Sequence, residues 1–533
     1  MKPPRPRTAL RKLLCVLLAL TALPAAALAT SSYTIIPTGL SVAMVVPPDM
    51  ELYPLRVMHR DAISILDLVY DSLVIINDDM QPEPSLATSW ETLSDGRTWK
   101  FTIRENVFFH DGRELTAYDV KATMDAIKAT ADAFEQPNQK GMYSELPSIL
   151  TRWEAEDERT LRVQTNRPYY GILYAMTFPV LQAQSAFEAN PPGTGPYCVD
   201  YYVPGQALWL RGNENWWFGP PPYVSEIACQ WYPSESAALT AFESEKVDIL
   251  MTRSTDAVRY RGTVSSRANS YTYSTRQLEC LMINNAVPKL RRDVRMRQAI
   301  AYAVNIPYLK ANVYQGMVLE SGTLQRPGTW LYNENVGDAY PAYNPDKARA
   351  LLDEMGWSQF NSEGYRTRQT ENGLDELILR MFYYDEAGNS LRKEAAGRIA
   401  DMLREVGIRV RPPTHYDFEG GSAKLKVGDY DLFLCSIFFD TTPDPTFLLS
   451  SSSNINYSRY NSSDMGNTLK EFRKAIEPED FQNQWFEIQR QMAEDMPFLP
   501  LYWREGMMLT RYPFSSIRDI REYELLRSIE RYK

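Results

Sequence analysis

Residues 84–120 constrain the fold more tightly than any other stretch of this 533-residue sequence. Apolar and polar side chains alternate from Trp99 to Ile103, which is the two-residue period of a strand with one buried face. Asp-Gly pairs stand on either side of that strand, at 95–96 and 111–112. Because both residue types tolerate positive φ, each pair predicts a tight turn. The stretch therefore predicts two short hairpins.

A helix start follows the second turn. Thr116 precedes Asp119 by three residues, which is the spacing of a capping box at a helix N-terminus. Val120, Met124 and Ile127 then recur at intervals that place them on one helical face. We therefore expect a small sheet followed by a helix that begins just after Thr116.

The chain is too long for a single hydrophobic core. At roughly 100 to 200 residues per domain, its 533 residues predict two to four lobes. A hydrophobic fraction of 44%, with 12% aromatic residues, is typical of a globular protein and excludes a largely disordered chain.

The N-terminus has the composition of a secretory signal. Basic residues within 2–12 precede an apolar run at 13–23, and Ala-Leu-Ala at 27–29 fits the small-residue cleavage rule. A membrane anchor is the alternative, but the run is shorter than the ~20 residues of a membrane span and Pro24 follows it. Cys15 lies inside the run, a poor position for a lipid-attachment site. We expect cleavage after Ala29 and a periplasmic or secreted protein.

The mature chain is acidic. Removal of residues 1–29 takes away five positive charges and no negative ones, so the formal net charge moves from −10 to −15. Nucleic acids and anionic lipids select basic surfaces, so neither is an expected partner. The acidity is compatible with a cationic ligand.

Four cysteines remain after the signal. An even number in an oxidising compartment permits two disulfides, with three possible connectivities. Free buried thiols are the alternative, and the spacings match no zinc or redox motif. The residues are Cys198, Cys229, Cys280 and Cys435.

Strands and helices alternate in the C-terminal half. A strand from Leu377 to Tyr383, a helix from Leu391 to Val406 and a strand from Ile408 to Val410 form a β-α-β pattern, and residues 430–434 predict another strand. This alternation implies an α/β lobe with a largely buried sheet.

Two other helices carry clear start signals. Asp293 caps a helix whose apolar residues share one face. Asn344 and Pro345 provide an N-cap and a proline at the first helical position, and Gly356 ends that helix.

Several phrases along the chain resemble one protein family. The phrases are PSLATSW at 84–90, DGRTWKF at 95–101, FHDGRELTAYDV at 109–120, GTGPY at 193–197 and VRMRQAIAYAVN at 294–305. Together they resemble the bacterial extracellular solute-binding proteins of family 5, the peptide and nickel class, which serve ABC importers.

The resemblance implies an α/β, periplasmic-binding-protein-like fold with two lobes, a hinge between them and an extra subdomain in the first lobe. The chain is expected to cross between the lobes more than once. The expected divisions are a signal peptide at 1–29, lobe I at 30–68, its extra subdomain at 69–192, lobe I again at 193–279, lobe II at 280–490 and lobe I at 491–533.

The sequence offers little for catalysis. We find no nucleophile elbow, no zinc-protease helix and no phosphate-binding loop. Its three histidines, His59, His110 and His415, lie far apart and lack metal-ligand spacing. We therefore expect no catalytic residues, no metal site and no cofactor.

The segment after the strand at 430–434 is the candidate ligand loop. Loops at the carboxyl ends of strands in α/β sheets are where ligands usually bind. The loop holds Asp440 and Asp444 in a D-x-x-x-D-P phrase. The resemblance implies that Asp440 pairs with the α-amino group of a peptide; the alternative is a solvated turn residue.

Other ligand contacts are nominated by residue type. Arg326 is the candidate cation for the opposite end of a peptide. Trp330 and Tyr383, with Tyr332 and Tyr384, could line a cleft with flat apolar surface and polar tips. With 11 Trp and 33 Tyr in the chain, however, a given aromatic residue is more often part of the core.

The sequence thus predicts a monomeric substrate-binding subunit of an ABC importer, which delivers a small solute to a membrane permease. A short peptide is the leading ligand, while nickel chelates, haem, opines and sugars stay open because a fold does not decide among them. A secreted hydrolase of peptides or glycans and a ligand sensor or chaperone are the alternatives.

Overall fold

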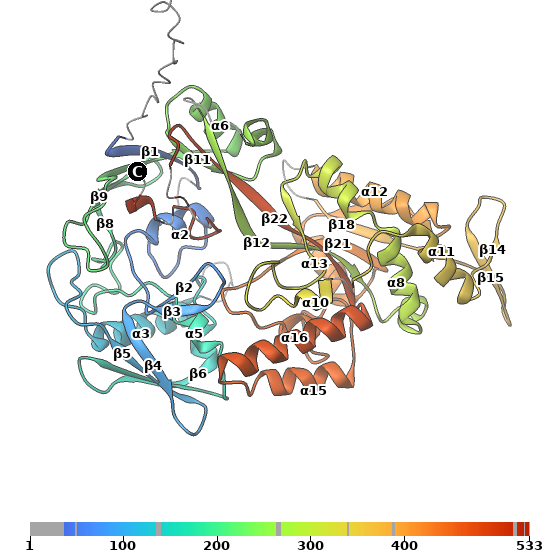
Figure 1. The fold of residues 1–533 in the computed structure, drawn as a ribbon, viewed down its shortest axis with the longest axis horizontal. Coiled ribbons are helices and arrows are strands. Elements are labelled where there is room, and N and C mark those ends of the chain that lie inside the picture. Colours follow the sequence, from blue (N-terminus) through green and yellow to red (C-terminus); the bar gives the residue numbers. More distant parts are fainter. Residues whose placement is uncertain are drawn as a thin grey trace, which may run out of the picture. The chain divides into compact units, whose positions relative to one another are not determined.

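The largest sheet of the computed structural model is built around two long antiparallel strands, β12 (Asn269–Ile283) and β22 (Phe498–Thr510), which lie side by side in Figure 1. The sheet has 11 strands in the order β20-β18-β21-β12-β22-β11-β1-β10-β9-β8, with β13 (Val318–Glu320) also paired to β22. The described residues are 37–47, 51–134, 140–262, 268–337, 340–385, 390–514, 517, 520–526 and 528–531. The predicted signal peptide lies outside them.

One half of this sheet comes mainly from the N-terminal part of the chain. Helix α6 (Glu235–Glu243) packs Ala238 and Phe242 against Leu250 and Leu509 of the sheet. The strands of this half are β1 (Gly39–Val45), β8 (Tyr197–Val203), β9 (Ala207–Gly212), β10 (Glu226–Tyr232) and β11 (Ile249–Thr252).

The other half belongs to the C-terminal part. Helices α8 (Val294–Ala303), α11 (Pro345–Glu354) and α12 (Leu391–Glu405) contribute to one continuous apolar core with its strands. The strands are β18 (Met381–Tyr384), β20 (Thr414–Tyr416) and β21 (Leu432–Phe438). Parallel pairing of β18 with both β20 and β21 confirms the α/β character predicted for this region.

The two halves are joined where the pairing of β12 with β22 is interrupted. Residues 269–274 pair in one register, and pairing resumes at Leu278 with a shift. Unpaired residues inside a strand pair allow local bending. Residues from Pro37 onward form one compact unit, so the lobe boundaries given above stay predictions.

The hairpin and helix predicted at 84–120 are present. Strands β4 (Ala87–Thr92) and β5 (Thr98–Ile103) flank a turn, and Gly96 in that turn has φ of +63°. Helix α3 (Ala117–Ala133) begins after Thr116, and Asp119 completes the capping box. The second turn is marked by one isolated bridge, Phe108 to Glu114, and not by a full hairpin. Strands β6 (Leu150–Ala155) and β7 (Thr160–Thr165) complete this four-stranded sheet.

The other predicted caps are confirmed. Asp293 accepts a hydrogen bond from the Arg295 amide of 2.9 Å, and Asn344 accepts one from the Lys347 amide of 2.9 Å. The four cysteines are free thiols, although Cys280 lies directly opposite Cys435 across β12 and β21.

The remaining elements complete the described fold. They are α2 (Arg60–Leu66), β2 (Val74–Ile76), β3 (Pro82–Pro84), α4 (Leu146–Ile149), α5 (Ile172–Ala175), η2 (Thr255–Tyr260), α7 (Pro288–Arg291), α9 (Ile306–Tyr308), η3 (Leu309–Val313), α10 (Glu334–Gly337), β14 (Gln359–Phe360), β15 (Arg366–Thr370), β16 (Gly373–Glu376), β17 (Ile378–Leu379), β19 (Arg409–Val410), α13 (Phe418–Val427), α14 (Thr446–Leu449), α15 (Ser463–Phe472), α16 (Pro478–Asp495) and η4 (Ile529–Arg531).

Candidate solute-binding cavity

A cavity of about 480 Å³ lies beside the interrupted stretch of β12. Its walls come from segments far apart in sequence, and its volume suits a small molecule. The lining residues lie within 63–85, 142–143, 177–218, 274–276, 324–329, 439–443, 503 and 521–531.

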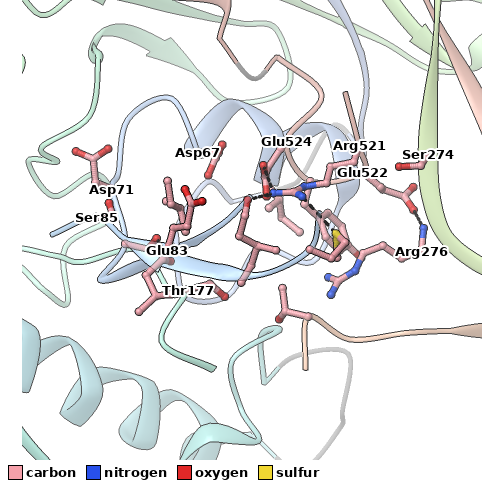
Figure 2. Close-up of a pocket in the computed structure, with 18 of the residues that line it drawn as sticks. Asp67, Asp71, Glu83, Ser85, Thr177, Ser274, Arg276, Arg521, Glu522 and Glu524 are labelled. Atoms are coloured by element: carbon pink, nitrogen blue, oxygen red, sulfur yellow. Dashed lines mark hydrogen bonds and ion pairs between the residues drawn. The ribbon is translucent and has the colours of Figure 1, made fainter. Parts of the chain in front are cut away.

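The cavity wall carries both signs of charge. Its carboxylates are those of Asp67, Asp71, Glu83, Asp440, Glu522, Glu524 and Glu530, and its guanidinium groups are those of Arg276, Arg326, Arg521 and Arg531. Figure 2 shows Arg276 and Ser274 on one side of the cavity and Asp71 and Ser85 on the other. A wall of this kind can bind a solute that carries separate positive and negative groups.

Asp71 contacts one of the recognised sequence phrases. One of its carboxylate oxygens, Oδ2, accepts hydrogen bonds from the Thr194 hydroxyl at 2.9 Å and the Trp217 indole at 2.8 Å. Thr194 belongs to the GTGPY phrase at 193–197. Burial raises the pKa of Asp71, and these neutral donors offset only part of that effect. The GTGPY phrase therefore helps to build this wall of the cavity.

Arg276 lies at the opposite wall, on β12. Its amide donates to Glu522 Oε2 at 2.9 Å and its carbonyl accepts from the Phe439 amide at 3.0 Å. The guanidinium group lies over the ring of Tyr523, 5.0 Å from the centroid, and 3.9 Å from Asp440 Oδ1. The backbone of Arg276 is thus fixed, while its charged group has one distant ion-pair partner among the described residues.

The end of the chain forms a third wall. Arg521 donates to the carbonyl oxygens of Asn77, at 2.8 Å, and Ile76, and it pairs with Glu524 at 2.8 Å. Glu522 forms an ion pair with Arg253. Apolar side chains of the same segment, including Leu525, Leu526 and Ile529, are fully buried. These contacts hold the segment against the rest of the cavity.

Aromatic side chains supply the apolar part of the lining. They are Tyr70, Tyr143, Trp216, Trp217, Phe218, Phe439, Trp503 and Tyr523. Burial raises the pKa of Tyr143, so its hydroxyl stays protonated near neutral pH and can act as a hydrogen-bond donor.

Two of the residues nominated from the sequence line the cavity, namely Asp440 and Arg326. The lining set does not include the other nominees, which are Asp444, Trp330, Tyr332, Tyr383 and Tyr384. All these assignments as ligand contacts stay predictions.

Each residue outside the lining has structural contacts. The Trp330 indole donates to the Met80 carbonyl at 3.0 Å. Tyr383 is 4% exposed within the apolar core. Asp444 lies 3.4 Å from the Arg167 guanidinium.

Sequence reasoning did not single out Asp71, Arg276 or the C-terminal segment. Asp71 lies outside the family phrases quoted above, in a Tyr-Asp-Ser-Leu sequence at 70–73. Arg276 had one available signal, a run of polar residues at 274–277 just before the mainly apolar end of the strand at 278–283. The segment at 520–531 has no hydrophobic period, so no local pattern indicates where it packs.

The described part of the chain contains no group of three or more His, Cys, Asp or Glu side chains arranged to hold a metal ion. Nor does any helix within the described ranges have the length and apolarity needed to cross a membrane.

The sequence itself defines the class of protein. Residues 81–459 match the family described as bacterial extracellular solute-binding proteins, family 5 Middle. This match covers more than two thirds of the chain. The chain therefore belongs to the family 5 extracellular solute-binding proteins, which confirms the resemblance seen in its motifs.

Individual relatives agree with this assignment. The oligopeptide-binding protein AppA of Bacillus subtilis (strain 168) is 22% identical over 486 residues, covering 86% of each chain. The structure of AppA with a nonapeptide has a TM-score of 0.65 at 20% identity and covers 93% of this chain and 98% of its own. A nickel ABC transporter structure from Bacillus halodurans has a TM-score of 0.77 at 16% identity, covering 91% and 98%. These likenesses confirm the periplasmic-binding-protein-like fold.

Proposed function

We propose that this protein is the substrate-binding component of an ABC importer and that its cargo is a short peptide. The cargo is captured in the cavity by hinge closure and passed to a membrane permease without chemical change. The observation that carries the proposal is the cavity of about 480 Å³, lined by carboxylates and guanidinium groups, in a chain of this family. A peptide with free ends is a zwitterion, and such a lining complements it.

Asp440 is the proposed anchor for the peptide's amino group. It follows β21, and its side chain is 53% exposed. The Thr441 amide and hydroxyl both donate to its Oδ1, at 2.6 and 3.1 Å, which orients the carboxylate. An ammonium group facing it in a closed cleft would form a charge-assisted hydrogen bond of about 1.5 to 3 kcal/mol.

Hinge closure is supported by the position of the cavity. Ser274 and Arg276 line it and lie next to the interrupted pairing of β12 with β22. A small change in backbone dihedral angles there would move the C-terminal half of the sheet relative to the N-terminal half. Rotation about a few such residues is the usual way in which two-lobed binding proteins close on a ligand.

We further propose that the mature protein is a monomer in the periplasm or the extracellular medium, with the signal removed after Ala29. N-terminal sequencing of the secreted protein tests this directly. A mature chain that begins before Ala25 would contradict it.

A nickel complex is the second candidate cargo. The nickel-binding periplasmic protein of Escherichia coli (strain K12) is 27% identical to this chain over 358 residues. The carboxylates that line the cavity could bind a metal ion that a small chelator already holds.

Native mass spectrometry of protein purified without denaturation distinguishes these cargoes. We expect an added mass that corresponds to a short peptide. A nickel-containing mass would favour the second candidate. Hydrolysis of added peptides or oligosaccharides into products would contradict both and indicate an enzyme.

A further inference from the structure

We propose that Arg276, held against the ring of Tyr523, binds the anionic group of the solute, which for a peptide is its C-terminal carboxylate. This inference rests on the proposed function and assigns a role to two residues that sequence reasoning did not nominate. It also assigns the C-terminal segment a part in ligand recognition.

The four arginines that line the cavity are engaged to different degrees. Arg521 donates to two backbone carbonyls and pairs with Glu524. Arg531 pairs with Glu530 at 3.2 Å, and Arg326 also has interaction partners. Arg276 differs because its one ion-pair partner among the described residues, Asp440, is 3.9 Å away. Its guanidinium group is therefore the one best able to accept a new anion.

The surroundings of Arg276 favour a carboxylate. Contact with the Tyr523 ring covers a face of the guanidinium group, which lies 5.0 Å from the ring centroid. The in-plane N–H groups of a guanidinium can form two parallel hydrogen bonds to a carboxylate. The side chain keeps 16% of its surface exposed, and Figure 2 shows its charged end directed into the cavity.

Tyr523 is fixed from both sides in an uncommon backbone conformation. Its φ is +72°, in the left-handed region that a residue with a bulky side chain rarely adopts. The Glu522 amide donates to the Ser274 carbonyl at 2.8 Å, and the Glu524 amide donates to the Arg521 carbonyl at 3.0 Å. Such conformations persist only where the surroundings hold them, and they cluster at binding sites. Here the held conformation places the ring against Arg276.

The distance between Asp440 and Arg276 limits the length of the solute. If Asp440 binds an ammonium group and Arg276 a carboxylate, the 3.9 Å between them favours a solute whose two charged ends lie close together. The contribution of Arg276 should therefore be largest for the shortest peptides.

Matched peptide pools test the assignment. One pool holds di- to pentapeptides with free C-termini, and the other holds the same sequences amidated at the C-terminus. Competition between the pools is measured by native mass spectrometry. The wild-type protein should prefer the free acids at least tenfold, most strongly for dipeptides. Arg276→Gln should reduce this preference to less than twofold, while the amidated pool is still retained.

Arg326→Gln is the matched control, because Arg326 also lines the cavity and is the cation nominated from the sequence. It should keep the preference for free acids. Loss of the preference in Arg326→Gln, with retention in Arg276→Gln, would overturn the assignment. Equal binding of both pools by the wild type would also overturn it, while leaving the proposed function intact. If the wild-type protein retains peptides from neither pool, both the proposed peptide function and this assignment are wrong.

Tyr523 is tested as a positioning residue. Tyr523→Phe keeps the ring and should keep the preference for free acids, whereas Tyr523→Ala should lower it several-fold. Thermal unfolding of each variant checks that it is folded. A preference that persists in folded Tyr523→Ala would contradict the positioning role of the ring.

Discussion

Glu279 and Arg276 lie three residues apart on β12, and the contrast between them separates the structural charges of this protein from those offered to a ligand. Glu279 is 0% exposed and accepts hydrogen bonds from Arg392, at 2.8 and 3.1 Å, and from Arg504 at 3.3 Å. Arg276 is partly exposed and has Asp440 3.9 Å away. The first charge is saturated by its neighbours, whereas the second can still accept a partner.

The pKa of Glu279 reflects this saturation. Burial by itself would raise the pKa of Glu279. The positive charges of Arg392 and Arg504 lower it by more than burial raises it, so the pKa lies below its usual value. The cluster thus keeps a negative charge in the centre of the sheet, beside the strand interruption that we propose as the hinge. Buried charges are costly unless their partners are in place.

The largest expected effect is therefore on stability at Glu279. Glu279→Ala leaves two buried guanidinium groups without their carboxylate, and we expect a loss of about 3 to 5 kcal/mol in the free energy of unfolding. Asp440→Ala, in the exposed loop, should change it by less than about 0.5 kcal/mol. Urea unfolding of both variants measures the difference. Similar losses of unfolding free energy in the two variants would contradict the distinction between a structural charge at Glu279 and a ligand-binding charge at Asp440.

The pH dependence of stability sharpens the same comparison. Because the pKa of Glu279 is lower in the folded state than in the unfolded state, the stabilisation is complete above the unfolded value of about 4.3. It is lost as the pH falls from there toward the folded pKa. Unfolding free energies between pH 6 and pH 3 should decline less steeply in Glu279→Gln than in the wild type. Parallel curves would show that Glu279 does not contribute.

The smallest expected effect is a loss of peptide affinity without a change in stability. Asp440→Asn removes the charge proposed to anchor an ammonium group, and we expect at least tenfold weaker peptide affinity, about 1.4 kcal/mol. The unfolding free energy should stay unchanged. Calorimetry with a retained peptide measures the affinity, and an unchanged value would exclude the amine-anchor role.

Local rules predicted much of the fold. The capping box of Thr116 and Asp119, and the N-caps Asp293 and Asn344, depend on residues a few positions apart, and all are present. The family motifs extended these local predictions to the whole α/β fold.

The candidate site was predicted less well, because its walls are set by long-range contacts. The C-terminal segment is anchored to Ser274, Asn77 and Ser64, each more than 200 positions away. No periodicity in the segment indicates such partners. Tyr383, which was nominated for a cleft by residue type alone, packs in the apolar core, and its role as a ligand contact stays a prediction.

Small-angle scattering with and without a retained cargo, followed by mass analysis of the cargo after release, tests the central claim most directly. We predict a smaller radius of gyration in the presence of cargo and a released cargo of unchanged mass. Equal radii, or a cargo whose mass has changed, would contradict capture of an unaltered solute by hinge closure.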